Sequence, residues 1–156
     1  AADGWMFVGM TDRGWGSVGP KRDGLQRLSW SGVTPFEVLR MTPSRDAFMF
    51  EFTQDLPDDC TSAEKLKEYR AISYTYEYHP DYGSAEMDKK EHAITGVQRL
   101  GARRLVVMID PLRTGPMGYV YEFTLPALAS KPDEKGQTHP LLHTKAYYTL
   151  RVAPKE

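Results

Sequence analysis

Residues 72–78 read Ile-Ser-Tyr-Thr-Tyr-Glu-Tyr, and this stretch decides the fold class. Apolar or aromatic side chains alternate with small or polar ones, so one face of an extended strand carries Ile72, Tyr74, Tyr76 and Tyr78. A helix would place these residues around its axis, because its side chains repeat every 3.6 residues. The stretch therefore predicts a β-strand with one aromatic face.

Short strand patterns lie on both sides of this stretch. Glycine, proline and polar residues separate them, as is typical of turns between antiparallel strands. The predicted strands cover residues 5–8, 25–30, 36–41, 47–52, 92–99, 104–109, 118–125 and 145–152. Several short strands joined by such turns predict an all-β fold, an antiparallel sandwich of two sheets.

One short helix is predicted between the strands. Thr61-Ser62-Ala63-Glu64 has the spacing of a capping box, with Thr61 as the N-cap and Glu64 at the third helical position. Leu66 and Tyr69 would then point inward from a helix that ends near residue 69. The charged residues 87–91, Met-Asp-Lys-Lys-Glu, predict a solvated turn.

The sequence divides into two parts. Residues 33–156 contain the sandwich strands, and residues 1–32 form an N-terminal extension with two short strands that cannot bury a core alone. The glycine-rich residues 14–21 of this extension do not match a phosphate-binding loop, because Pro20 precedes Lys21 and Arg-Asp-Gly follows it. A structured turn is the simpler interpretation.

Composition excludes several classes of function. The 156 residues are 40% apolar and 26% charged with a formal net charge of -1, which gives no general attraction to nucleic acid or to anionic membranes. No apolar run approaches the about 20 residues of a membrane helix. Cys60 is the single cysteine, so an intrachain disulfide and a CxxCH haem attachment are impossible.

The tyrosines are the best candidates for a binding site. Aromatic rings stack on the C–H face of a sugar, while phenol hydroxyls hydrogen-bond outward. Such a platform would consist of Trp15, Tyr74, Tyr76, Tyr78 and Tyr82. The alternative is structural, because tyrosines at alternate strand positions commonly cover a sandwich core or pair across strands. The sequence leaves both alternatives open.

The histidines do not predict a metal site. They lack the short, fixed spacing of zinc ligands, and they are His79, His92, His139 and His143. A loop cation site made by His79, Asp81 and Asp88 would match no EF-hand. We therefore expect no bound metal and no cofactor.

Catalytic patterns are also missing from the sequence. Cys60 follows Asp58 and Asp59, whose carboxylates would raise rather than lower the pKa of its thiol, whereas a helix N-terminus after it would oppose this effect, so the sequence assigns no net shift. No Gly-x-Ser-x-Gly motif is present, and no nucleophile lies beside a recognisable base. We expect no catalytic residue and no enzyme activity.

Specific segments carry a resemblance to a known protein class. The early ones resemble the junction after a sorbosone-dehydrogenase-like β-propeller: Asp12-Arg13-Gly14-Trp15-Gly16-Ser17, Gly24-Leu25-Gln26-Arg27-Leu28 and Pro35-Phe36-Glu37-Val38. The later ones resemble the immunoglobulin-like domain beyond that propeller: Tyr74-Thr75-Tyr76-Glu77-Tyr78, Tyr82-Gly83-Ser84, Gly118-Tyr119-Val120-Tyr121-Glu122, Leu141-Leu142-His143 and Tyr147-Tyr148-Thr149-Leu150. This resemblance covers nearly the whole chain.

The resemblance implies a large, exported, planctomycete-type multidomain protein with a preceding propeller and often a c-type cytochrome domain. It implies an immunoglobulin-like β-sandwich for residues 33–156, with residues 1–32 as the last propeller strands. We expect a noncatalytic accessory module that braces the propeller or binds a glycan or cell surface, without membrane insertion. The alternatives are a fragment that contributes to the active-site rim of a sugar dehydrogenase, and a metal-binding sandwich.

Overall fold

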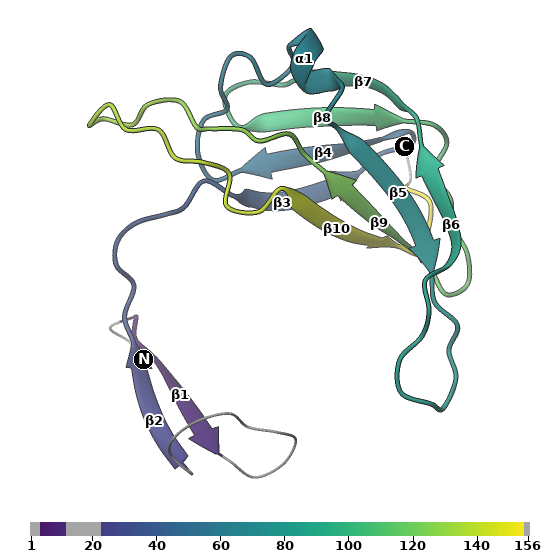
Figure 1. Ribbon diagram of the computed structural model, residues 1–156, viewed down its shortest axis with the longest axis horizontal. Helices are drawn as coiled ribbons and strands as arrows, with labels where there is room; N and C mark the ends of the chain where they lie inside the picture. The colour runs from purple at the N-terminus through teal and green to yellow at the C-terminus, as the bar shows by residue number, and fades with distance from the viewer. Residues whose placement is uncertain (1–3, 12–22, 155–156) are drawn as a thin grey trace. The chain divides into compact units, whose positions relative to one another are not determined.

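The computed structural model describes residues 4–11 and 23–154 (Figure 1). They belong to two compact units, Ala1–Thr34 and Pro35–Glu156. The smaller unit is a hairpin of β1 (Met6–Thr11) and β2 (Asp23–Leu28), paired without a register shift. Large apolar side chains of this unit are exposed, among them Phe7, Leu25, Trp30 and Val33. A two-stranded sheet has no second layer against which to bury them.

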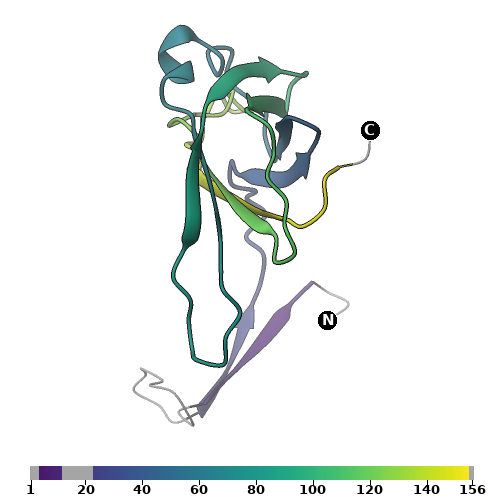
Figure 2. The ribbon, with the colours of Figure 1, turned by 90° about the vertical axis from the view of Figure 1, so that its right-hand side faces the viewer.

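The larger unit is an antiparallel sandwich of two four-stranded sheets, seen from two sides in Figures 1 and 2. The strand order of one sheet is β3 (Val38–Pro43), β4 (Ala47–Phe52), β8 (Arg104–Ile109) and β7 (Ile94–Arg99). That of the other is β10 (Lys145–Leu150), β9 (Tyr119–Thr124), β5 (Arg70–Thr75) and β6 (Met87–His92). The all-β prediction is confirmed.

The connectivity of the sandwich is that of an immunoglobulin-like domain. When β3, β4, β5, β7, β8, β9 and β10 are lettered A to G, the first sheet has the order A-B-E-D and the second has the order G-F-C. Strand β6 is an additional strand beside C. Immunoglobulin domains commonly join strands B and F with a disulfide. Here the facing strands β4 and β9 carry Phe50 and Phe123, whose rings meet edge to face at 5.2 Å between centroids. An aromatic contact thus lies where the disulfide would be.

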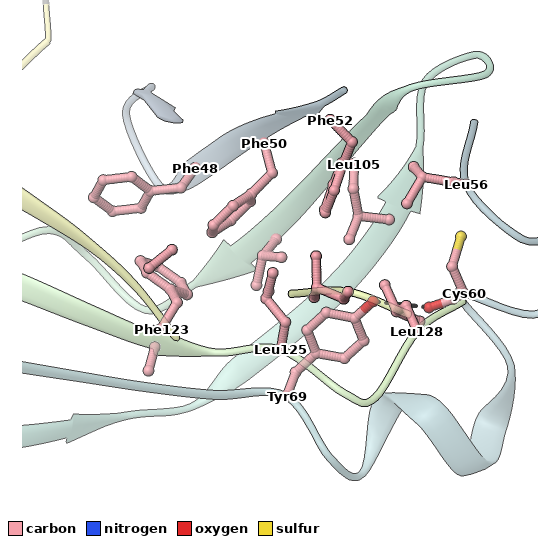
Figure 3. Packing of buried hydrophobic residues seen from close by; sticks show 14 of the residues in the cluster. Phe48, Phe50, Phe52, Leu56, Cys60, Tyr69, Leu105, Phe123, Leu125 and Leu128 are labelled. Carbon is pink, nitrogen blue, oxygen red and sulfur yellow. Dashed lines mark hydrogen bonds between the residues drawn. The ribbon is translucent and has the colours of Figure 1, made fainter. Parts of the chain in front are cut away.

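Alternate residues of the central strands fill the space between the sheets (Figure 3). Fully or almost fully buried side chains include Phe48, Phe50, Phe52, Leu105, Val107, Tyr121 and Phe123. Each buried aromatic or branched side chain contributes about 1.5–3 kcal/mol of hydrophobic stabilisation. The single thiol, Cys60, is also buried, and burial raises its pKa.

Tyr121 fixes the loop between β8 and β9. Its hydroxyl donates a hydrogen bond to the carbonyl oxygen of Arg113 (3.1 Å) and accepts one from the Arg113 amide (2.5 Å), eight residues upstream. Tyr121 stands two residues before Phe123, which is the position of the tyrosine corner in immunoglobulin-like domains. The corner is present here without its usual cysteine neighbour.

The helix differs from the predicted one. It is α1 (Ala63–Leu66), and its N-cap is Ser62, whose hydroxyl accepts from the Lys65 amide at 3.3 Å; the prediction of Thr61 as N-cap was wrong by one residue. Tyr69 is buried as expected and donates to the Cys60 carbonyl at 2.9 Å. Leu66, however, is 37% exposed, because the helix ends before a second turn could face the core.

Three further secondary-structure predictions were wrong. Residues 87–91 are most of strand β6 rather than a turn, and β5 ends at Thr75, so Tyr76 and Tyr78 follow the strand instead of continuing it. The predicted strand 92–99 is divided at Ala93, where the chain leaves one sheet and enters the other. No helix in the described residues is long and apolar enough to cross a membrane.

We predict that Tyr121→Phe destabilises the sandwich by about 1–3 kcal/mol, because both backbone groups of Arg113 lose their partner in a partly buried site. Chemical denaturation measures this free energy of unfolding. The matched control is Tyr78→Phe, which removes a hydroxyl from a side chain that is 87% exposed and should change stability by less than about 0.5 kcal/mol. Equal stabilities of the two variants would contradict a structural role for the tyrosine corner.

Candidate functional site

The candidate binding site is the loop of residues 76–86, which joins β5 to β6 and projects beyond the sheets (Figures 1 and 2). Three aromatic side chains of this aromatic loop are accessible: Tyr76 is 41% exposed, Tyr78 87% and Tyr82 99%. Such exposure of large rings on a projecting segment is more typical of a contact surface than of core packing. The loop is therefore the described segment best suited to present rings to a ligand.

The base of the aromatic loop is built from side-chain contacts. The Glu77 amide donates to the Ser84 hydroxyl at 3.1 Å across the loop. The ring of Tyr76 packs edge to face on Tyr74, with centroids 5.5 Å apart. Gly83 has a φ of +86°, a conformation that a side chain would strain. These contacts position the start of the loop and permit its tight return.

The tyrosines predicted to form one platform lie in different environments. Tyr74 is 4% exposed, so its ring supports Tyr76 instead of offering a stacking face; burial raises the pKa of its phenol. Tyr76, Tyr78 and Tyr82 lie in the aromatic loop. Trp15 lies outside the described residues. The regular alternation expected from residues 72–78 ends with the strand at Thr75.

A second feature, which the sequence did not reveal, is a buried chain of hydrogen bonds between Ser73, His92 and Asp110. The Nε2 atom of His92 lies 2.8 Å from the Ser73 hydroxyl, and its Nδ1 atom lies 2.5 Å from Oδ1 of Asp110. Ser73 comes from β5, His92 from the last position of β6 and Asp110 from the residue after β8. We call these three residues the polar triad.

The polar triad continues into a charged cluster. Arg113 donates to the Ser73 hydroxyl (3.3 Å), to the Asp88 carbonyl oxygen (2.9 Å) and to the Asp88 carboxylate. Its guanidinium lies 4.2 Å from the centroid of the Tyr119 ring, and the Tyr119 hydroxyl donates to the same carboxylate at 2.6 Å. The Tyr119 hydrogen bond and the Arg113 charge lower the pKa of Asp88. The cluster joins the edge strand β6 to the loop before β9.

The order Ser-His-Asp resembles that of a hydrolase triad, but its setting differs. A nucleophilic serine needs an accessible hydroxyl beside groups that stabilise an oxyanion. Ser73 has no exposed surface, and its oxygen already accepts a hydrogen bond from Arg113 while it faces His92. Every hydrogen-bonding atom of the triad side chains has a protein partner or reaches solvent at the half-buried Asp110. This arrangement satisfies buried polar groups where the sheets meet.

The setting of His92 favours the neutral imidazole. Burial lowers its pKa from the ordinary value of 6.5, although the Asp110 carboxylate acts in the opposite direction. Neutral imidazole has one N–H, which is best placed on Nδ1 to donate to Asp110, while Nε2 accepts from Ser73. Burial would raise the pKa of Asp110, but hydrogen bonds from Lys90 and His92 outweigh it and hold that pKa below its ordinary value.

The other histidines occupy separate places. His139 lies 3.3 Å from an Asp133 oxygen and His143 lies 2.6 Å from a Glu37 oxygen, so the i, i+4 pair has two different partners. His79 lies in the aromatic loop, and its Nδ1 atom is buried without a hydrogen-bond partner. In the parts of the chain that the structure describes, no three His, Cys, Asp or Glu side chains gather closely enough to hold a metal ion.

We predict that lowering the pH destabilises the wild-type protein through His92. Its folded-state pKa lies below the unfolded value of 6.5, so the unfolded chain binds the proton first. The contribution is complete above pH 6.5 and is lost as the pH falls below it. The free energy of unfolding, measured against pH by urea denaturation, should fall less steeply in His92→Gln.

The control for this prediction is His143→Gln, which changes an imidazole whose side chain is 71% exposed. It should change the free energy of unfolding at pH 7 by less than about 1 kcal/mol, because an exposed ion pair contributes little. A His92→Gln curve parallel to the wild-type curve would show that His92 has the same pKa in both states, and would contradict the prediction.

Comparison with known proteins supports the fold. The chain is similar to the crystal structure of the N-terminal part of the bacterial S-layer protein SbsC, with a TM-score of 0.51 and 11% sequence identity. The match covers 76% of this chain and 24% of that one, so this chain spans about a quarter of its length. No family model and no curated protein sequence matches the chain. The established result is an immunoglobulin-like sandwich that shares its architecture with part of a bacterial S-layer protein.

Proposed function

We propose that this chain is a noncatalytic accessory module of an exported multidomain protein, and that its aromatic loop binds polysaccharide at a cell surface. The observation that carries the proposal is the exposure of Tyr78 and Tyr82, 87% and 99%, on a loop projecting from a rigid sandwich. Loops held by such scaffolds are common positions for binding residues. Tyrosine combines a stacking face with a hydroxyl that bonds to sugar hydroxyls.

Two further observations support a surface-binding module. The fold is similar to part of a bacterial S-layer protein, which favours an exported setting for this chain as well. The polar triad, which has the residue types of a hydrolase, keeps its serine without exposed surface, and this favours a structural role.

A second candidate function has its own observation. The hairpin β1–β2 exposes Phe7 by 54% and Leu25 by 73%, and a two-stranded sheet of this kind needs a further layer or strand to bury such residues. This supports the alternative in which residues 1–32 complete a preceding propeller and the sandwich braces it or contributes to its active-site rim. The metal-binding alternative has no supporting group of ligands in the described residues.

We predict that replacing a loop ring weakens polysaccharide binding without unfolding the protein. A glycan array and pull-down with insoluble polysaccharides identify a ligand, and titration then gives Kd. Tyr78→Ala should weaken binding by about 1–2 kcal/mol, roughly 5- to 30-fold in Kd, as expected for one stacking ring. Its free energy of unfolding should change little because the side chain is exposed.

Tyr78→Phe is the matched control, since it keeps the ring and removes the hydroxyl. It should retain most of the affinity. The proposal would be wrong if the wild-type protein bound no polysaccharide, or if Tyr78→Ala and Tyr82→Ala both bound as tightly as the wild type.

A further inference from the structure

Three of the four edge strands of the sandwich carry features that discourage pairing with another chain. β3 has a register shift between Val38 and Arg40 and ends in Pro43. β7 has a shift between Ile94 and Gly96. β6 has four consecutive charged residues, 88–91. The first of them, Asp88, has a φ of 49°. Bulges, proline and charge are the usual protections of a sheet edge.

The fourth edge strand, β10, lacks these protections. Its residues 145–150, Lys-Ala-Tyr-Tyr-Thr-Leu, pair with β9 at six consecutive positions without a register shift. Its one charge, Lys145, is neutralised by Glu122 at 2.5 Å, and the next five residues are uncharged. A long, regular and uncharged edge offers its outer N–H and C=O groups to another strand.

A groove of about 400 Å³ lies beside this edge, between β10 and β3. Its lining includes Val38 and Met41 from β3 and Ala146 and Tyr148 from β10. At one end the two sides are joined, because the Leu142 amide donates to the Phe36 carbonyl oxygen at 3.0 Å. A strand added to β10 would direct alternate side chains toward this groove, whose lining also includes Glu37 and Lys145.

We propose that the occupant of this edge is β10 of a second copy of the chain, paired antiparallel about a two-fold axis at Tyr147. In this register Tyr147 faces Tyr147 of the second copy. Lys145 of each copy faces Thr149 of the other, and Ala146 faces Tyr148. No like charges meet, and an aromatic pair stands at the centre. Tyr148 of each copy lies opposite the small Ala146, while its ring stays packed edge to face on Phe48 of its own sandwich, at 5.6 Å between centroids. The two sheets then form one continuous eight-stranded sheet.

Other symmetric registers fit less well. A two-fold axis at Tyr148 would set Lys145 against Arg151, two like charges. An axis at Ala146 would pair only residues 145–147 within the strand. An axis between residues would place an outward side chain opposite an inward one, which the pleat does not allow. The same patch serves both partners, as a two-fold dimer requires.

Sedimentation velocity of the full chain over a range of concentrations tests the proposal. The wild type should dimerise, and Tyr147→Lys should raise the dimer dissociation constant about tenfold or more, because two lysines would face each other and the aromatic pair would be lost. Tyr147 is 54% exposed, so folding should be unaffected. Leu39→Lys adds the same charge at a 63% exposed site on β3 and should leave the dissociation constant nearly unchanged.

A mixture provides the sharper experiment. Tyr147→Lys and Tyr147→Glu should each be mainly monomeric, whereas their equimolar mixture should regain the dimer, because only a two-fold axis at residue 147 places the two side chains opposite each other. A monomeric wild type would overturn the proposal. It would instead favour a strand of another protein as the partner of β10. Association that Tyr147→Lys does not weaken would also overturn it, and would point to the exposed hairpin β1–β2. Failure of the mixture to dimerise would exclude this register.

Discussion

Packing between β4 and β9 is the interaction on which the rest of the sandwich depends. The chain has one cysteine, so its sheets cannot be joined by a disulfide. Phe123 contacts both Phe48, at 4.9 Å between centroids, and Phe50, at 5.2 Å. Edge-to-face aromatic pairs add about 0.5–1.5 kcal/mol to the burial of their surface. Without a covalent bridge the sheets depend on shape and apolar burial, and loss of one ring leaves a cavity between them.

The polar groups of the core complement this packing. His92 lies 5.3 Å from Tyr121 between ring centroids, so the polar triad and the tyrosine corner meet at the same end of the sandwich. Both attach the loop after β8 to the sheet that contains β9. Buried polar groups favour a single arrangement of their surroundings, because any other arrangement leaves a donor or acceptor unpaired. The aromatic loop leaves the sheet at β5, which supplies Ser73 to this network.

The sequence predicted the parts of the fold in which side-chain alternation meets a buried layer. Strands 47–52 and 104–109 were predicted with their observed bounds, because one face of each is apolar and buried. β6 was missed because all its residues except His92 are exposed. An edge strand with two solvated faces shows no alternation of apolar and polar residues that the sequence could reveal. Propensity alone cannot distinguish such a strand from a polar turn.

For the candidate site, the sequence predicted only which residue types it would contain. The tyrosines of residues 74–82 were predicted either to form an exposed platform or to cover the core. Their separation into a buried support and a projecting loop depends on where β5 ends. The polar triad could not be found, because Ser73 and His92 are 19 residues apart and meet through strand pairing. One signal was available: a serine at an inward strand position, beside the buried Ala71, needs a polar partner.

The lack of a disulfide determines how this module would respond to tension. A bridge between β4 and β9 would prevent extension of all residues that it encloses, whatever force acted on the ends. Without it, the 122 residues of the unit Pro35–Glu156 can be drawn out to about 400 Å, since an extended residue spans about 3.4 Å. Under load the domain can thus unfold over its whole length, because no covalent bridge limits its extension.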